Sequence, residues 1–347
     1  MKKNILMLVA ALVSSAFTGA CTAPAADSSE EIAESEQEMR LMNGSRLTGV
    51  ALSGSSVNGA ALDDVRFTGM DLGGTALKDV TLKGTTLSAV LADGTILSGV
   101  ELIGATMVGV LTDGSEVTLR IDDVIPTADA DILNYRISHV GSRGASTPIC
   151  GLDVDGTEMM SFPLAGRYDQ SVGTPTGGSF IADATQFSLA CKGSAVAKCA
   201  ELGYKPFKTA KECNSLGQCH DVSLAPLHQA CVRMVRADYC GDGASHTYIG
   251  TEIDVFDTFR IKNEDPTVPG SIEAEWGVDG ATCVLHTRWV SAMHGDVQQY
   301  MQDHCPGRYE PMSAVCARST STFNTDVGYS MSMDDRALLR NRSEVHQ

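Results

Sequence analysis

Residues 75–110 read TALKDVTLKGTTLSAVLADGTILSGVELIGATMVGV, and a five-residue pattern runs through them. A large apolar residue recurs at every fifth position, as at Leu77, Leu82 and Leu87. Gly often stands two positions after it. A period of five matches neither the helical period of 3.6 nor the strand period of two. The chain must therefore turn after each apolar residue, and Gly supplies the backbone freedom for that turn.

The same register extends over residues 43–118, with Ala92 and Thr112 as exceptions. It resembles the pentapeptide-repeat family, in which the central apolar residue lies inside a right-handed quadrilateral β-helix. The resemblance implies about four coils stacked at strand spacing, about 4.8 Å apart. Gly stands where that family usually has a polar residue, so a less regular helix or a flexible segment are the alternatives. A rigid stalk or a cap for the next domain is the expected role, rather than mimicry of DNA.

Composition divides the chain into two kinds of material. Its 347 residues suggest roughly two domains, and 43% hydrophobic residues suffice for a core. Acidic residues outnumber basic ones 43 to 26, for a net charge of −17. That balance argues against nucleic acid or an anionic membrane surface as the main partner. Seventeen of the nineteen aromatic residues follow residue 120, so an ordinary aromatic core is expected only there.

Residues 1–20 are predicted to be a signal peptide for export. Lys2 and Lys3 precede an apolar run at residues 5–13 that is too short to cross a bilayer. The segment Phe17–Cys21 resembles a bacterial lipobox, which implies a lipid on Cys21, although Thr18 replaces the usual Leu. Ordinary signal-peptidase cleavage after Ala20 is the alternative.

Residues 21–42 are predicted to be the lipidated cysteine and an acidic tether. Six acidic residues there face a single base, Arg40. Such a segment repels itself and buries little, and it could reach about 70 Å when extended. Thr22, where some lipoproteins have Asp, resembles a signal for sorting to the outer membrane. A lipid-anchored location at the outer membrane or cell surface is therefore expected, with a secreted or periplasmic protein as the alternative.

Residues 119–317 are predicted to form a mixed α+β domain. Strands are expected at residues 118–124, 132–140, 180–190, 248–259, 272–276 and 283–290, and helices at 194–202, 223–236 and 296–304. Residues 318–347 are expected to be a loosely ordered tail with one short helix at 334–341. Ten cysteines remain if cleavage occurs at or after Cys21, and an even number in an exported chain favours five disulfides. The candidates are Cys150, Cys191, Cys199, Cys213, Cys219, Cys231, Cys240, Cys283, Cys305 and Cys316.

Their pairing stays open at this stage, because ten cysteines allow 945 connectivities, by the counting that gives 105 for eight. Zinc is not favoured, because no Cys-x-x-Cys occurs and the spacing of Cys213 and Cys219 is too wide for the usual knuckle.

Residues 235–243 read VRADYCGDG, and residues 250–255 read GTEIDV. These segments resemble the ADYC domain, whose motif is matched here by Ala237, Asp238, Tyr239, Cys240, Gly241, Asp242 and Gly243. The segments at 190–193, 198–204 and 274–277 fit the same family. The resemblance covers most of residues 120–317 and implies an exported bacterial lipoprotein, often with Leu- and Gly-rich repeats in front. It implies no activity, because the family has none established.

Several residues nevertheless suggest possible chemistry. Cys240 near His246 resembles a nucleophile with its base, and His286, His294 and His304 are further candidates. Asp238 and Asp242 could be a carboxylate pair for glycoside hydrolysis, although Asp commonly forms turns. Residues 153–158 resemble a calcium loop without its distant Glu, so a hairpin turn is preferred. Trp276 and Trp289 could form a sugar platform, but such residues are more often core.

The sequence therefore predicts a β-helix followed by a disulfide-rich α+β domain, without a cofactor or metal. The expected function is a non-catalytic surface, binding or structural module. Its expected partners are a membrane, through the N-terminal lipid, and an envelope protein or glycan, but not nucleic acid. The alternative is a secreted hydrolase with its active site in the domain at 119–317.

Overall fold

The structure is a computed structural model that describes residues 46–48, 60–141, 144–153, 155–214, 216–248, 250–257, 259–308 and 337–347. The predicted signal peptide, the predicted lipidation site Cys21 and the predicted acidic tether lie outside these ranges. Over the described residues the chain is mostly β, with three short α-helices and one 3-10 helix. The predicted α+β class is therefore corrected to a mostly β fold.

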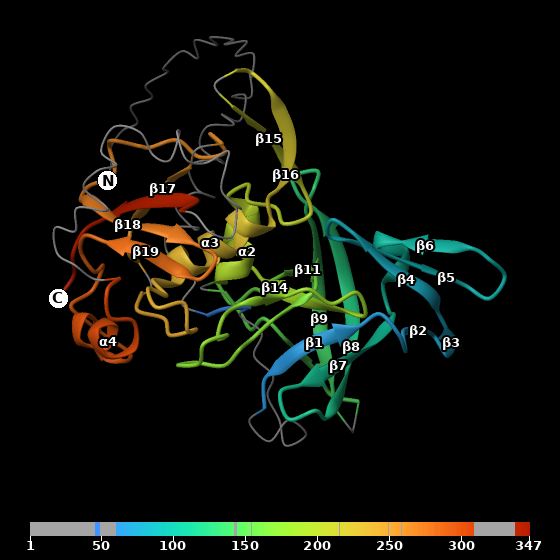
Figure 1. The fold of residues 1–347 in the computed structure, drawn as a ribbon. Coiled ribbons are helices and arrows are strands. Elements are labelled where there is room, and N and C mark those ends of the chain that lie inside the picture. Colours follow the sequence, from blue (N-terminus) through green and yellow to red (C-terminus); the bar gives the residue numbers. More distant parts are fainter. Residues whose placement is uncertain are drawn as a thin grey trace, which may run out of the picture.

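Six antiparallel strands close into a barrel (Figure 1). Around the ring these are β1 (Leu62–Arg66), β14 (Gln186–Cys191), β11 (Ser161–Ala165), β9 (Leu133–Val140), β8 (Glu116–Pro126) and β7 (Thr106–Leu111). In β1, Val65 pairs with Phe187 on one side and with Gly109 on the other, and this double pairing closes the ring. Closure removes the unpaired edges that an open sheet would leave. Strands from both sides of residue 118 therefore belong to one barrel.

The predicted β-helix is wrong for residues 60–118, which fold into antiparallel hairpins. After β1 come β2 (Asp71–Leu72) and β3 (Thr75–Ala76), which extend the sheet beside β7. A separate sheet holds β4 (Lys78–Lys83), β5 (Thr86–Val90) and β6 (Ile96–Ser98). The 3-10 helix η1 (Gly99–Leu102) then leads to β7. Residues 49–59 of the repeat lie outside the described residues.

The hairpins are compatible with the five-residue period. Two successive repeats, ten residues in all, make up one strand together with the turn that follows it. Glycines with positive φ recur every ten residues, at Gly74, Gly84, Gly94, Gly104 and Gly114. Across the β4–β5 turn, Leu82 pairs directly with Leu87, so two successive repeat leucines lie opposite each other on one face. The repeat's apolar residues do reach a core: Leu62, Leu77, Leu87, Leu102, Met107 and Val117 are buried in the barrel cluster.

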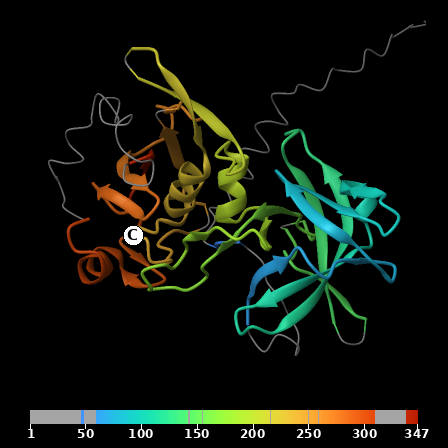
Figure 2. The same ribbon diagram turned by 45° about the vertical axis from the view of Figure 1, so that its right-hand side comes forward.

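In the other half of the molecule, the longer of two helices packs on a four-stranded antiparallel sheet, and the shorter packs against that helix and β14 (Figure 2). The helices are α2 (Ala195–Glu201) and α3 (Ala225–Arg236). The sheet order is β17 (Ile253–Asp257), β22 (Leu339–Ser343), β18 (Ser271–Gly277) and β19 (Gly280–Val284). A third helix, α4 (Val297–His304), follows later in the chain. The helix expected at residues 334–341 is wrong where it can be compared, because β22 is an inner strand of this sheet.

Two barrel strands join the halves by serving both cores. Side chains alternate between the faces of a strand. In β14, Phe187 and Leu189 face the barrel interior, whereas Ala190 packs with the helices. In β11, Phe162 and Leu164 also belong to the helical cluster. The same wall therefore lines both hydrophobic cores.

Short hairpins and edge strands complete the fold. They are β10 (Ser146–Pro148) beside β9, and the pairs β12 (Arg167–Tyr168) with β13 (Phe180–Ile181), β15 (Thr209–Cys213) with β16 (Cys219–Ser223), and β20 (Ser291–Ala292) with β21 (Gly295–Asp296). No helix within the described ranges is long and apolar enough to cross a membrane.

The barrel interior leaves no room for a side chain at Gly109. A Cβ there would lie 2.7 Å from Cδ1 of Leu62 and 3.0 Å from Cγ2 of Val117. We expect Gly109→Ala to lower the free energy of unfolding by about 1–3 kcal/mol through overpacking. The matched control is Gly141→Ala, whose Cβ meets only the carbonyl oxygen of Ala145 at 3.6 Å. Urea unfolding of both variants checks this, and equal midpoints would contradict the barrel register.

Candidate functional site

The motif that distinguishes this sequence begins where α3 ends. Ala237 takes a left-handed conformation, with φ 52° and ψ 42°, and its backbone N–H donates to the last helical carbonyls. This conformation ends the helix and turns the chain back across it. The residues that follow, Asp238 to Gly243, form a loop that is almost entirely buried.

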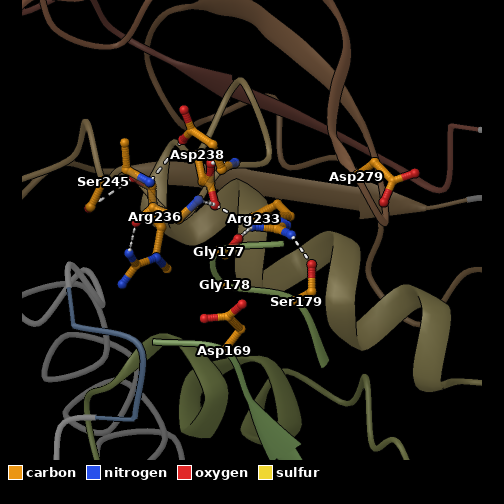
Figure 3. Close-up of polar contacts among 12 residues, drawn as sticks. Asp169, Gly177, Gly178, Ser179, Arg233, Arg236, Asp238, Ser245 and Asp279 are labelled. Atoms are coloured by element: carbon orange, nitrogen blue, oxygen red, sulfur yellow. Dashed lines mark hydrogen bonds and ion pairs between the residues drawn. The ribbon is translucent and has the colours of Figure 1, made fainter. Parts of the chain in front are cut away.

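Asp238 has no solvent exposure and is held by three donors (Figure 3). Its Oδ2 accepts from Nη1 of Arg233 at 2.5 Å and from the backbone N–H of Gly243 at 3.0 Å. Its Oδ1 accepts from the backbone N–H of Asp242 at 3.1 Å. Burial raises the pKa of Asp238, and the guanidinium groups of Arg233 and Arg236 oppose that rise. A buried carboxylate needs such partners to offset the loss of water.

Arg233 connects the motif to a second loop, residues 169–179. Its Nη1 donates to the carbonyl of Gly177 at 2.5 Å, and its Nη2 donates to Oγ of Ser179 at 2.8 Å (Figure 3). The two backbones approach so closely that a Cβ on Gly177 would overlap the carbonyl oxygen of Asp242. Glycine is therefore required at this crossing. The loop lies between β12 and β13, so Arg233 links the helical half to a hairpin beside the barrel.

Tyr239 anchors a second buried ion pair. Its hydroxyl donates to Oε1 of Glu273 at 2.9 Å and accepts from the backbone N–H of Arg288 at 2.8 Å. Arg288 pairs with Glu273 at 3.0 Å and also donates to the carbonyls of Met234 and Val235 at the end of α3. Burial acts to raise the pKa of Glu273, but Arg288 and the hydrogen bonds hold it below its usual value. This network satisfies helix carbonyls that would otherwise lack partners.

The predicted disulfides are present wherever both cysteines are described. The pairs are Cys150–Cys191, Cys199–Cys231, Cys213–Cys219 and Cys240–Cys305. Cys283 is also disulfide-bonded, and Cys316 lies outside the described residues. Cys240 is therefore part of a covalent bridge to the end of α4 and carries no free thiol. The bond agrees with the expectation that Cys240 is a disulfide cysteine, and it excludes the alternative of a Cys240 nucleophile with His246 as its base.

The histidine candidates separate into two places. His246 contacts the rings of Tyr300 and His294, with centroids 4.6 and 5.5 Å away, and His304 stacks on Tyr300. His286 instead lies near the backbone of Ser271. His246 is 1% exposed, and neither ring nitrogen has a hydrogen-bond partner. Burial, with His294 nearby, lowers the pKa of His246 to about 4, so the ring is neutral at ordinary pH.

The remaining candidates have structural surroundings. Asp242 accepts from the hydroxyl of Tyr300 at 2.8 Å, and with Asp238 buried the two carboxylates do not form an open pair around a scissile bond. Asp153 closes a turn through bonds from the N–H groups of Asp155 and Thr157. Trp276 is fully buried, and Trp289 is flanked by the rings of Tyr248 and His346. Over the described residues, no group of three or more His, Cys, Asp or Glu could hold a metal ion.

The arrangement thus uses the motif for folding. Ala237 reverses the chain, Asp238 and Tyr239 each meet a buried arginine, and Cys240 is bridged. Sequence reasoning missed Arg233, Arg288 and Glu273, because nothing in their spacing shows that they face these residues.

Asp238→Asn should destabilise the protein by about 3 kcal/mol, because it leaves Arg233 buried beside an uncharged partner. The matched control is Asp279→Asn, which removes an exposed carboxylate close to the same network (Figure 3). Chemical unfolding of both variants at neutral pH provides the measurement. A stability loss that is equal in the two variants would refute the role of the buried pair.

Two buried histidines differ in their hydrogen bonds, so substitution by Phe should destabilise the protein to different extents. Nδ1 of His228 bonds the hydroxyl of Tyr168 and its Nε2 bonds the carbonyl of Val196, both at 3.0 Å, whereas His246 has no such partner. At pH 7.5, we expect His228→Phe to lower the free energy of unfolding by about 2 kcal/mol or more, because it leaves two hydrogen-bond partners unsatisfied. We expect His246→Phe to lower it by less than about 1 kcal/mol. Chemical unfolding of both variants provides the measurement, and equal losses would contradict the difference in hydrogen bonding.

The pH dependence of stability provides a second test of His246. Its folded pKa of about 4 lies below the usual value of 6.5, so the unfolded chain binds more protons between these pH values. Stability is therefore fully present above pH 6.5 and is lost as pH falls toward 4. His246→Phe should remove up to about 3 kcal/mol of that loss. An unchanged acid profile for this variant would contradict a buried neutral His246.

Comparison with known families assigns both parts of the chain. The model of the ADYC domain matches residues 99–290, and the model of pentapeptide repeats matches eight copies at residues 45–84. No curated protein and no solved structure matches the chain. The ADYC match covers more than half of the sequence. It includes the buried loop at residues 238–243, Arg233 and the Glu273–Arg288 pair. The chain therefore belongs to the ADYC domain family and carries pentapeptide repeats before that domain.

Proposed function

We propose that this protein is an exported, lipid-anchored envelope protein whose ADYC domain acts as a non-catalytic binding module. The observation that carries the proposal is the complete use of the family motif in folding. Asp238 and Tyr239 lie within buried ion-pair networks, and Cys240 is half of a disulfide. Catalysis needs reactive groups that a substrate can reach. The motif instead stabilises the fold of the domain, and the folded domain presents a stable surface.

Disulfide chemistry supports export. Four bridges occur among the described residues, and disulfides persist mainly in oxidising compartments. The basic start, the apolar run and Cys21 then support lipid attachment, and Thr22 supports sorting to the outer membrane. In this proposal, the acidic tether at residues 22–42 holds the folded part away from the lipid.

A protein is the favoured partner rather than a glycan. Sugar binding commonly uses an open aromatic face, but Trp276 is buried and Trp289 lies between Tyr248 and His346. Protein recognition instead needs a rigid surface with apolar anchors. A disulfide-bonded domain supplies the rigidity that this kind of recognition requires.

Cys21→Ser tests the anchor. We expect metabolic labelling with a fatty acid to mark the parent protein, and the variant to lose both the label and its association with membranes. Thr18→Leu is the matched control, because it restores the usual lipobox residue and should keep or increase the label. Absence of label from the parent would refute the lipoprotein proposal.

A further inference from the structure

Residues 291–304, which comprise β20, β21 and α4, form a strap that is fixed to the body at both ends. Figures 1 and 2 show α4 at the outer edge of the helical half. Before the strap, the backbone N–H of Val290 donates to the carbonyl of His346 at 2.9 Å. After it, Cys305 is bridged to Cys240 in the buried loop. The middle of the strap can therefore separate from the body while both ends stay attached.

Few apolar side chains hold the strap between these two ends. Of the eight residues of α4, only Val297 and Met301 are buried. From the β20–β21 hairpin, Ala292 joins the same core, whereas Met293 is 72% exposed. Lifting the strap therefore uncovers little apolar surface. Local openings of this kind require less free energy than unfolding of the whole domain.

The strap also covers His246. The ring of His246 packs against the rings of Tyr300 and His294 on the strap, with centroids 4.6 and 5.5 Å away. His246 is 1% exposed, and both of its ring nitrogens are buried without a hydrogen-bond partner. A neutral imidazole can occupy this position. An imidazolium carries two N–H donors, and burying them with neither an acceptor nor water is costly.

The charges around His246 oppose its protonation. The ionisable groups that face its ring are Arg236 on α3, Tyr239 and Asp242 in the buried loop, and His294, Tyr300 and His304 on the strap. Burial, followed by His294, His304 and Arg236, lowers the pKa of His246 to about 4, and Asp242 acts in the other direction. The hydroxyl of Tyr300 already donates to Asp242 at 2.8 Å. Protonation therefore favours a movement that returns the ring to water.

The strap is the part that such a movement would displace. The backbone N–H of His246 donates to the carbonyl of Arg236 at 3.0 Å, which keeps the histidine beside α3. The buried loop is held by the ion pair of Asp238 with Arg233 and by the bonds of Tyr239. The strap instead depends on a few apolar contacts and on the packing of its rings against a neutral His246.

We propose that the strap is an acid-sensitive switch: when His246 takes up a proton, residues 291–304 lift from the body, while Val290 and Cys305 keep both ends attached. The movement uncovers the ring of His246 and the inner side of α4. Return to neutral pH removes the charge, and the attached strap closes again. The switch belongs to the domain itself and does not depend on the proposed binding function.

Methionine oxidation by dilute hydrogen peroxide tests the switch in the full chain. Peroxide passes one oxygen atom to an accessible thioether and leaves water, and peptide mapping by mass spectrometry gives the rate at each site. Met301 on the inner side of α4 is 0% exposed, Met234 on α3 is 1% exposed, and Met293 is exposed throughout.

Between pH 7 and pH 4, we expect the oxidation rate of Met301 relative to Met293 to rise at least about tenfold, while Met234 stays protected. A pKa of about 4 in the closed form and of 6.5 in the open form shifts the equilibrium toward opening by up to about a hundredfold. A sample returned to pH 7 before peroxide is added should regain the protection of Met301.

Two variants identify the trigger. His246→Phe keeps an aromatic ring but cannot be protonated, so Met301 should stay protected at pH 4. The matched control is His286→Phe, which lies near the backbone of Ser271 and should respond to acid as the parent does.

Three results would overturn the inference. The first is a parent protein in which Met301 stays protected at pH 4. The second is exposure of Met301 and Met234 together, which would mean that the domain unfolds as a whole. The third is a release of Met301 that persists in His246→Phe.

Discussion

A carboxylate and a guanidinium that are both removed from water meet at the centre of this fold. Arg233 is 1% exposed at its side chain and Asp238 is not exposed at all. Neither charge is tolerable there unless every donor and acceptor around it is placed. That requirement fixes the end of α3, the reversal at Ala237 and the path of residues 169–179 together. The pair therefore constrains two segments that are far apart in the sequence, residues 233–243 and residues 169–179.

The second ion pair extends the same constraint into the sheet. Arg288 satisfies carbonyls at the end of α3 while its guanidinium binds Glu273 on β18 and its backbone N–H donates to the hydroxyl of Tyr239. Asn341 on β22 donates to Glu273 and accepts from Trp276, which places the last described strand in the network. The motif thus sets how the helix, its turn and the sheet pack. The buried loop can contain ionisable groups because each of these networks supplies them with hydrogen-bond partners.

Local patterns in the sequence predicted local structure well. The helices near residues 194–202, 223–236 and 296–304 and the strands near 118–124 and 132–140 follow from apolar periodicity, which depends on neighbours along the chain. The β-helix failed because a five-residue period states how often the chain turns but not in which direction. Leu82 opposite Leu87 satisfies that period in a flat hairpin as well as in a coil. Strand pairing is the information that one sequence lacks.

The site was harder to predict than the elements around it. The motif was recognisable, and an even cysteine count indicated disulfides, but Arg233 and Asp238 gained meaning only when the loop at residues 169–179 crossed them. That crossing depends on the small size of Gly177 and Gly178. In the sequence, these two glycines look like part of an ordinary polar turn. The sequence therefore located the important segment but not the partners of its side chains, because contacts over long separations decide whether an Asp is a turn former, a catalyst or half of an ion pair.

The closed barrel has a consequence for how such chains can be rearranged. Strands β1 and β7 come from the repeat register, whereas β9, β11 and β14 come from the sequence that follows it. Neither segment can complete the ring alone, and the β11–β14 wall is also a surface of the helical core. Recombination that exchanged the repeats for an unrelated stalk would open the barrel and uncover that wall. The repeats and the sequence after them therefore form one structural unit in this barrel.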